Sequence, residues 1–273
     1  MRPVEQAASR NLPPAGFGLG CPFPLSKAII GQRGNGLRQI SEVSVIGAFF
    51  DVVGTIYKGA FWRDISHHNR ARKRNRFWIW AYLIWHMAGW PLNLAGLLSQ
   101  RRWYEAWARD MAWLFRGLTV EEGQEIFDWI CDERLVPNLR LDIMDILRDH
   151  QAKGHLVALV SGSPQRLLDT ITSRLDMEHA IGTTFEVKDG RYTGKIAGSL
   201  TMYQGKMAAL QDFAAESGAS IDWQNSFAYG DSRSDIDLLA SVGHPVAVYP
   251  DEELKAVALE KGWEIVGERE PRT

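Results

Sequence analysis

Three aspartates in two segments of the chain could hold a divalent metal ion. Asp51 directly follows the apolar run of residues 45–50, and Asp231 and Asp235 stand four residues apart in the segment GDSRSD. Carboxylates from separate segments repel one another unless a cation lies between them. Oxygen ligands favour a hard ion, and Mg²⁺ is the usual one where phosphate supplies further oxygens. Asp235 also fits a second interpretation, an acid favoured near a helix N-terminus by the helix dipole.

A second group of residues could bind an anion. Ser161, Gly162 and Ser163 offer hydroxyl and backbone N–H groups just before a predicted helix, which is a typical anion site. The simpler interpretation is an N-cap, because serine commonly caps helices. Lys206 stands near the start of another predicted helix, where the dipole favours acids rather than bases. It is therefore either an ordinary surface lysine or a cation that reaches a bound phosphate.

Short strands that alternate with helices would position these residues. Five apolar runs that end in polar turns predict strands, at residues 45–50, 155–160, 226–230, 245–249 and 263–266. Helical patterns lie at residues 164–175, 204–217, 234–241 and 251–261, and residues 185–196 predict a hairpin turning at Asp189–Gly190. This alternation predicts an α/β fold with a Rossmann-like parallel sheet covered on both faces. Ligands bind at the carboxyl edge of such sheets, so we expect Asp51, Ser161 and Asp231 to meet there.

A long helical segment interrupts the alternation after the first strand. Residues 57–144 are predicted to form an inserted α-helical cap, and residues 43–56 and 145–267 to form the α/β core. Nine of the eleven tryptophans lie in the insertion, which we expect to cover the crevice at the sheet edge. His67 and His68 are expected on its surface, because neighbouring helical residues diverge and cannot form a ligand pair.

Composition narrows the class of protein. The net charge of -2 and the pI of about 6.4 give no indication of a nucleic-acid partner. Cys21 and Cys131 stand far apart in no metal-binding spacing, which predicts free thiols in a reducing compartment and hence a cytoplasmic location. Residues 1–42 hold five of the eleven prolines and no apolar run long enough for a signal peptide. We expect this segment to be a disordered extension, and residues 268–273 to be a short tail.

Four motifs together resemble those of a known family. The segments FFDVVGT, LVSGS, GK and YGDSRSD, in that order, are similar to the motifs of haloacid dehalogenase superfamily phosphatases. The helical insertion after the first motif and the segment GRYTGKI before the lysine resemble the phosphoserine-phosphatase-like branch. The resemblance runs from about residue 45 to residue 267. It implies a Mg²⁺-dependent hydrolase of small phosphomonoesters with a Rossmann-like core and an α-helical cap.

The resemblance also implies roles for the acidic residues. Asp51 matches the nucleophile that takes the phosphoryl group as an aspartyl-phosphate. Asp231 matches a Mg²⁺ ligand, and Asp235 matches the acid that supports Asp231 and Lys206. The metal would be held by Asp51, Asp231 and the backbone carbonyl of residue 53.

The remaining motif residues match the phosphate site of the family. Ser161, the backbone at Gly162 and Lys206 match the groups that hold the phosphate and neutralise its charge. Thr55 matches the hydroxyl that fixes the first loop of the phosphate site.

Val53 departs from the family pattern. Phosphatases of this family have a second aspartate there, which protonates the leaving oxygen and later deprotonates the attacking water. Valine can do neither, and the loss of such a group costs roughly 10²–10⁴ in rate. Three interpretations remain: a slow phosphatase, a phosphate-binding protein without turnover, or a single change in an active lineage. Ala60 replaces the glutamate that recognises the substrate amine in phosphoserine phosphatases, so phosphoserine is not the expected substrate.

The insertion contains a segment that could contact a membrane. The basic run RARKRNR, residues 70–76, precedes 22 uncharged residues, 77–98. We expect Gly89 and Pro91 to break a helix there, which leaves a helix of about 21 Å against a hydrocarbon core of about 30 Å. Three interpretations follow: a helix in the core of the cap, an interfacial helix, or a membrane span. Basic residues beside a tryptophan-rich apolar face suit an anionic membrane surface and a lipid-like, amphipathic phosphomonoester.

Overall fold

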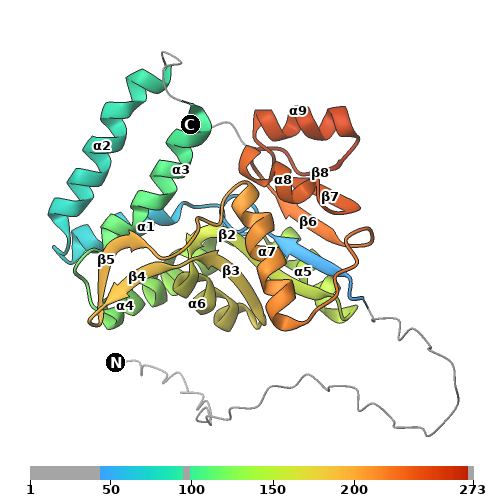
Figure 1. Cartoon of the computed structure of the whole chain (residues 1–273), viewed down its shortest axis with the longest axis horizontal. Coiled ribbons are helices and arrows are strands. Elements are labelled where there is room, and N and C mark those ends of the chain that lie inside the picture. Colours follow the sequence, from blue (N-terminus) through green and yellow to red (C-terminus); the bar gives the residue numbers. More distant parts are fainter. Residues whose placement is uncertain (1–43, 95–98, 270–273) are drawn as a thin grey trace, which may run out of the picture. The chain divides into compact units, whose positions relative to one another are not determined.

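The computed structural model describes residues 44–94 and 99–269. The predicted extension of residues 1–42 lies outside the described residues, as do residues 270–273 of the predicted tail. The described chain contains a six-stranded parallel sheet in the order β3-β2-β1-β6-β7-β8 (Figure 1). Its strands are β1 (Gly47–Phe50), β2 (Leu156–Pro164), β3 (His179–Thr183), β6 (Phe227–Gly230), β7 (His244–Val248) and β8 (Glu264–Val266). The predicted α/β class and parallel sheet are confirmed.

Five of the six strands coincide with the predicted apolar runs, and the sixth, β3, was not predicted. Its sequence, HAIGT, is short. The exposed fraction of its residues varies along the strand, because β3 lies at the edge of the described sheet, next to β2. An edge strand with polar and glycine residues gives no apolar run to detect. The strand β1 lies in the middle of the sheet, with all four residues buried between β2 and β6.

Helices cover both faces of the sheet, because successive side chains of each strand point to opposite faces. Phe50 packs in the cluster that contains residues of α5 (Leu141–Ala152) and α6 (Gln165–Leu175). Phe49 packs in the other cluster, with residues of the helices α7 (Gln204–Ser217), α8 (Ile236–Leu239) and α9 (Glu252–Lys261). A short 3₁₀ turn, η4 (Arg233–Asp235), precedes α8.

Helices fill the segment between β1 and β2, as predicted for the cap. They are α1 (Phe61–Ala71), α2 (Arg76–Leu94), α3 (Gln100–Asp110) and α4 (Val120–Ile130), with the short turns η1 (Met111–Phe115), η2 (Cys131–Leu135) and η3 (Val136–Asn138). Residue 144, the predicted end of the insertion, lies inside α5, which packs against β2. The domain boundaries therefore stay a prediction.

The predicted hairpin forms and contacts the helical insertion. The strands β4 (Phe185–Lys188) and β5 (Arg191–Ile196) are joined at Asp189 and Gly190, both with positive φ, as a two-residue hairpin turn requires. The ring of Phe115 in η1 lies 5.5 Å from that of Phe185 and 5.4 Å from that of Tyr192. The hairpin thus connects the core to the insertion.

The expectation that Gly89 and Pro91 break the helix was wrong. The helix α2 continues through both residues to Leu94 with Pro91 inside its last turn, because a proline removes one helical hydrogen bond and can kink a helix without ending it. Gly89 lies against α3, since a Cβ there would be 3.4 Å from Trp103 Nε1. No helix among residues 44–94 and 99–269 is long and apolar enough to cross a membrane.

The surface expectation was also wrong for one of the two adjacent histidines. His67 is exposed, but His68 is buried, and its ring lies 5.1 Å from that of Trp129 in α4. The divergence of neighbouring residues on a helix sends one side chain outward and the other inward. Contact with α4 decides which of the two histidines is buried, so the sequence of α1 alone could not predict it.

A buried histidine couples the fold to pH. His150, in α5, has Nδ1 2.8 Å from His155 Nδ1 and Nε2 2.8 Å from the Tyr229 hydroxyl, so each ring nitrogen is engaged. Burial, together with the neighbouring His155 and Lys153, lowers the pKa of His150 from 6.5 to about 4. The folded protein therefore keeps this ring neutral at pH values where the unfolded chain protonates it.

We predict that this histidine destabilises the protein in acid. The unfolded state binds more protons between about pH 6.5 and 4, so the His150 contribution is complete above pH 6.5 and is lost as the pH falls. The difference in unfolding free energy between the native chain and His150→Gln should change by about 2 kcal/mol from pH 7 to pH 4.5. Urea unfolding at several pH values measures this, and taking the difference cancels the titration of the site carboxylates.

The matched control is His67→Gln, which removes an exposed histidine of α1. A pH-dependent change for His150→Gln no larger than that for His67→Gln would contradict the prediction.

Candidate active site

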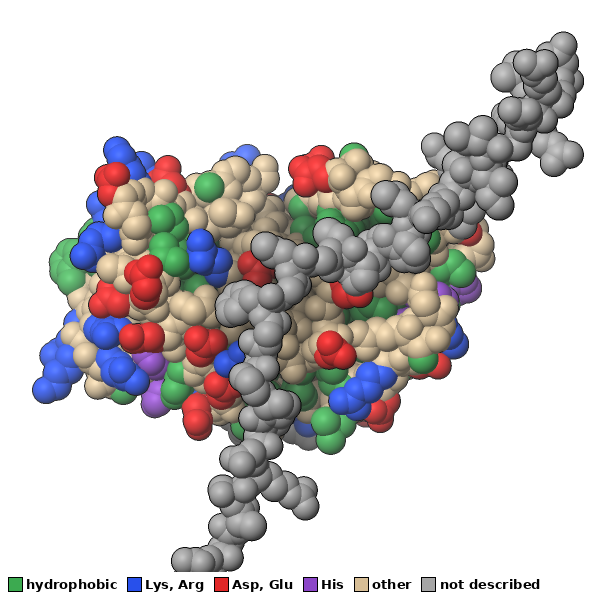
Figure 2. Space-filling view, turned by 90° about the horizontal axis from the view of Figure 1, so that it is seen from below, with side chains coloured by type: hydrophobic (Ala, Val, Ile, Leu, Met, Phe, Trp, Pro, Cys, Tyr) green, Lys and Arg blue, Asp and Glu red, His purple; other side chains and the backbone are tan. Residues whose placement is uncertain are grey.

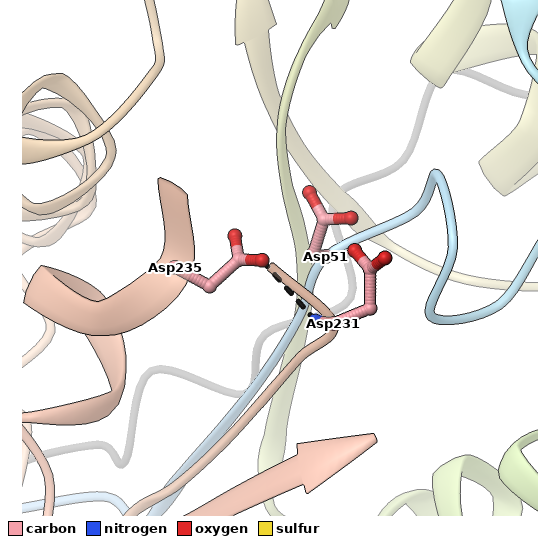
Figure 3. A group of neighbouring side chains, drawn as sticks. All are labelled: Asp51, Asp231 and Asp235. Carbon is pink, nitrogen blue, oxygen red and sulfur yellow. Dashed lines mark hydrogen bonds between the residues drawn. The ribbon is translucent and has the colours of Figure 1, made fainter. Parts of the chain in front are cut away.

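The carboxyl edge of the sheet brings the three predicted aspartates together. Asp51 follows β1, Asp231 follows β6, and Asp235 ends the turn η4 (Figure 3). One carboxylate oxygen from each lies within 4.8 Å of the others, and all three side chains are buried. The backbone N–H of Asp51 donates to Tyr229 O at 2.9 Å, so the pairing of β1 with β6 continues up to the site.

Lys206 lies between two of these acids. Its ammonium nitrogen is 2.5 Å from Asp51 Oδ1 and 2.5 Å from Asp235 Oδ1, and only 1% of the side chain is exposed. Burial lowers the pKa of Lys206, but the charges of Asp235 and Asp51 outweigh it and leave the pKa above its ordinary value. The lysine is therefore a fixed positive charge in the site, and the surface interpretation does not hold.

The oxygens of Asp235 are already occupied. Asp235 Oδ1 accepts from Lys206, and Oδ2 accepts the backbone N–H groups of Asp231 at 3.2 Å and Ser232 at 3.0 Å. The first of these two N–H bonds is drawn in Figure 3. Asp235 thus holds the turn that presents Asp231 and orients the lysine, which leaves Asp51 and Asp231 as the acids whose oxygens could face an ion.

The charge around Asp51 and Asp231 favours an additional cation. Burial raises the pKa of Asp51 to about 6, with Lys206 lowering it and Asp235 raising it. Burial, with the charges of Asp235 and Asp51, also raises the pKa of Asp231. When both carboxylates are ionised, the positive charge around them is too small to balance theirs. Two such buried oxygen donors fit a hard divalent ion such as Mg²⁺.

Arg269 contacts the site and was not predicted. Its Nη2 donates to Asp231 Oδ2 at 3.0 Å, and about a third of the arginine side chain is exposed. The residue stands in the segment predicted as a tail, where no motif or periodicity marks it. The guanidinium supplies a positive charge at the oxygen that a metal ion would also use.

Two glycines permit the close approach of the carboxylates. Gly54 has φ +96°, and a Cβ on it would lie 2.1 Å from Asp231 Oδ2. A Cβ on Gly230 would lie 2.4 Å from the Asp235 Cβ. A side chain at either position would displace an acid of the site, so each glycine is a steric requirement of the geometry.

The first loop is held by its backbone rather than by Thr55. The Gly54 N–H donates to Tyr57 O at 2.7 Å, and Arg140 Nε donates to Gly54 O at 3.0 Å. Thr55 is buried, and among the described residues its hydroxyl has no hydrogen-bond partner. The predicted loop-fixing bond is therefore absent from the described contacts, and this hydroxyl stays available to a ligand. Arg140 was not predicted, because it comes from α5's N-cap, far along the sequence.

The serine segment lies at the end of β2, ahead of α6. Ser161 is buried, with its hydroxyl 3.1 Å from that of Ser163, and the β2–β3 register shifts between Val160 and Pro164. Neither serine caps α6, whose N-cap is Pro164. A Cβ on Gly162 would lie 3.3 Å from Thr201 O, so the segment touches the loop that leads to Lys206.

Val53 is partly buried and packs against the core beside Tyr57. The position expected to carry a general acid thus has an apolar side chain in an apolar setting.

The helical insertion reaches the rim of the site. At the start of α3, Gln100 Oε1 accepts from Arg233 Nη1 at 3.5 Å, and the Arg101 guanidinium lies 4.7 Å from the Tyr203 ring centroid. Arg233 belongs to the GDSRSD turn, and Tyr203 is the N-cap of α7, which carries Lys206. The insertion therefore contacts two loops that present site residues, as expected of a cap.

Comparison with known proteins decides the family. A family model described as haloacid dehalogenase-like hydrolase matches residues 48–240, which include the three aspartates, the serine segment and Lys206. The chain belongs to the haloacid dehalogenase-like hydrolase family. Among curated proteins, the hydrolase is 29% identical over 223 residues to phosphoserine phosphatase SerB1 of Mycobacterium tuberculosis, covering 80% of this chain and 69% of that protein. It is 31% identical over 148 residues to a histidinol-phosphatase of Neisseria meningitidis, covering 54% and 67%.

Solved structures share the fold. A protein of unknown function from Bordetella pertussis Tohama I superposes with a TM-score of 0.70 at 24% identity, covering 82% of this chain and 99% of that chain. A phosphoserine phosphatase in its apo form superposes with a TM-score of 0.57 at 17% identity, covering 83% and 94%. Together with the sequence relatives, this fold places the hydrolase in the phosphoserine-phosphatase-like branch of the family.

We predict that Mg²⁺ stabilises the protein through Asp231. Ion binding to the folded state alone, at about 100 times the dissociation constant, adds about 2.7 kcal/mol, which corresponds to a Tm increase of about 5 °C. Asp231→Asn should abolish the increase, whereas Asp212→Asn, an exposed position on α7, should retain it. Differential scanning calorimetry with Mg²⁺ and then EDTA measures this. An undiminished increase in Asp231→Asn would show that the ion binds elsewhere.

We also predict that Arg269 competes with the ion. Arg269→Gln should lower the Mg²⁺ concentration needed for half of the Tm increase by up to about fivefold, since a partly exposed ion pair contributes about 1 kcal/mol or less. The same variant without Mg²⁺ should be slightly less stable than the native chain. Arg166→Gln, an exposed charge of α6, is the control and should leave the midpoint unchanged. A higher midpoint in Arg269→Gln would mean that the arginine assists the ion instead.

Proposed function

We propose that the hydrolase is a Mg²⁺-dependent phosphatase that cleaves phosphomonoesters through an aspartyl-phosphate on Asp51. The observation that carries this proposal is the placement of Asp51, which is buried, 2.5 Å from the charged Lys206 and close to Asp231. A carboxylate nucleophile needs neighbouring positive charge, because it must approach an anionic phosphate.

The side chains of the site suit the two steps of such a reaction. A carboxylate oxygen of Asp51 attacks phosphorus, the ester P–O bond breaks, and the leaving oxygen takes a proton. Water then attacks the phosphorus of the aspartyl-phosphate, which releases inorganic phosphate, gives up a proton and restores the Asp51 carboxylate.

The phosphate oxygens would be held by Lys206, the Ser161 hydroxyl, the Gly162 N–H and the Thr55 hydroxyl, which has no hydrogen-bond partner within the described part of the chain. Asp51, the Val53 carbonyl and Asp231 would hold Mg²⁺, which supplies charge neutralisation for the phosphate. Asp235 supports this arrangement through its bonds to Lys206 and to the Asp231 backbone.

Val53 makes slow turnover part of the proposal. The leaving oxygen takes its proton from solvent, because valine has none to give, so esters of poorly acidic alcohols should react slowly. The apolar contacts of Val53 favour a second candidate function, a phosphate-binding or membrane-associated protein that retains the site without turnover.

We propose an amphipathic, lipid-like phosphomonoester as the substrate, met at an anionic membrane surface. The relatives' names include phosphoserine and histidinol phosphatases, but Ala60 lacks the carboxylate expected for an amine-bearing substrate such as phosphoserine. The tryptophan-rich helices α2 and α3 pack together, and α3 begins at the rim of the site.

Phosphatase assays on aryl and alkyl esters, including lysophospholipid phosphates, test this proposal. The native chain with Mg²⁺ should hydrolyse aryl phosphates, whose leaving groups need no general acid, and Asp51→Asn should not. Val53→Asp should raise alkyl-phosphate turnover by about 10²-fold or more, and the neutral, similarly shaped Val53→Asn should not.

The results separate the two candidate functions. If the native chain binds phosphate but neither hydrolyses aryl esters nor forms a phosphoenzyme at Asp51, the binding function stands and the phosphatase proposal fails. If Val53→Asp and Val53→Asn have the same turnover of alkyl phosphates, position 53 is not the place where a general acid is missing.

A further inference from the structure

The outward face of α2 is apolar along the length whose side chains are described. Phe77 is 72% exposed, and Ile84 and Trp85 are each 64% exposed. We call the α2 face the set of exposed large apolar side chains on this helix: Phe77, Trp80, Ile84, Trp85, Met87 and Trp90. The residues exposed between and beside them, Ala88 and Pro91, are apolar as well. Most of the set follows helical spacing, so a single side of the helix carries it.

The opposite side of α2 packs into the insertion. Ile79, Tyr82 and His86 are buried, and the Trp107 ring of α3 lies 5.0 Å from the Tyr82 ring and 4.7 Å from the His86 ring. Figure 1 shows α2 beside α3, with its other side turned away from the sheet. The buried side of the helix therefore holds it in place, and the α2 face takes no part in that packing.

The exposed apolar side chains are concentrated rather than scattered. Of the eleven exposed large apolar side chains in the described part of the chain, six belong to the α2 face. Single exposed apolar residues are normal on protein surfaces, whereas a contiguous patch marks an interaction site.

Basic side chains adjoin one end of this face. We call the basic collar Arg63 and Arg70 of α1, Lys73 of the connection and Arg76 of α2. Within residues 44–94 and 99–269, none of these four side chains forms an ion pair. In Figure 2, lysine and arginine side chains lie among aspartate and glutamate side chains near the end of the molecule that bears α1 and the start of α2 in Figure 1.

The collar borders two surface hollows that share Arg70. One, of about 510 Å³, is lined by Trp62, Arg63 and Ser66, among others, and the second, of about 280 Å³, by Lys73, Arg76 and Trp80, among others. Ser66 is buried, and among the described residues its hydroxyl has no hydrogen-bond partner. The hollows therefore combine a buried hydroxyl, indole rings and cations that form no ion pair among the described residues. The Arg63 and Arg70 guanidinium groups lie 5.2 and 5.3 Å from the Trp62 and Trp80 ring centroids, and the set fits a phosphate group joined to an apolar chain.

We propose that the α1–α2 hairpin docks on an anionic lipid bilayer. The basic collar binds lipid phosphates, and the α2 face enters the boundary between head groups and acyl chains, where tryptophan is favoured. Charge complementarity favours this occupant, because a second copy of the chain would bring the same basic collar to the interface, whereas anionic lipid neutralises it. This docking deepens the proposed meeting with an anionic membrane surface and rests on that part of the proposed function. The surface includes neither Asp51 nor Lys206, so a failure of docking is distinguishable from a failure of the proposed reaction.

Vesicle binding tests the docking surface. The full chain should co-sediment with vesicles of phosphatidylglycerol and phosphatidylcholine at low salt, and much less with phosphatidylcholine alone or at 0.5 M salt. The triple change Arg70→Gln, Lys73→Gln and Arg76→Gln should weaken binding on the order of 10–100-fold. Ile84→Ser with Trp85→Ser should weaken it similarly and remove the quenching of tryptophan fluorescence by brominated lipid.

Matched variants distinguish this surface from general charge and apolarity. Removing three other exposed cations with Lys188→Gln, Lys195→Gln and Lys255→Gln, or the exposed Leu259 with Leu259→Ser, should leave binding within about twofold of the native chain. Light scattering on the same samples reports the oligomeric state. Absence of binding to anionic vesicles, equal losses in test and control variants, or dimers that only the α2-face variant dissociates would each overturn the proposal.

Discussion

The buried ammonium of Lys206 between Asp51 and Asp235 is the interaction on which the candidate site depends. It joins the loop after β1 to the turn after β6 through a side chain from α7, at 2.5 Å on each side. A buried charge without a partner is strongly destabilising, so these three segments are held in one arrangement. Because one lysine supports two acids while Asp231 lies nearby, the site retains a demand for further positive charge, which Arg269 meets in part.

The fold makes that arrangement possible by simple geometry. Parallel strands end at one edge, so loops far apart in sequence deliver their side chains to the same place. Gly54 and Gly230 then allow the carboxylates to approach more closely than any side-chain-bearing residue would permit. The insertion adds contacts at the rim through α3, while α2 turns an apolar side outward beside the basic collar. The proposed phosphate chemistry and the proposed lipid docking thus belong to different parts of one chain.

The fold was largely predictable where local pattern and burial agree. Apolar runs marked five of the six strands, and the Asp189–Gly190 turn marked the hairpin. The strand β3 escaped because an edge strand needs no continuous apolar run. Two further features also escaped, the continuation of α2 through Pro91 and the burial of His68. They are accompanied by contacts with Trp103 of α3 and Trp129 of α4, which lie far along the sequence. Within the site, nothing in the sequence indicated the roles of Arg140 and Arg269. The role of a single arginine depends on the group it contacts, here Gly54 O and Asp231 Oδ2, and that contact forms only in the folded chain.

The sequence by itself determined the kinds of chemistry present: acids after strands, a serine–glycine segment, one lysine before a helix, and a valine where an acid is expected. Residue type and spacing are local properties, and they do not depend on how distant segments pack. Only the tertiary structure decided that Lys206 is buried between two carboxylates and that the α2 face is exposed. It also decided that the oxygens of Asp235 accept hydrogen bonds from the lysine and the backbone. Charge balance and burial are set by neighbours from remote segments, so they exist only once the chain has folded.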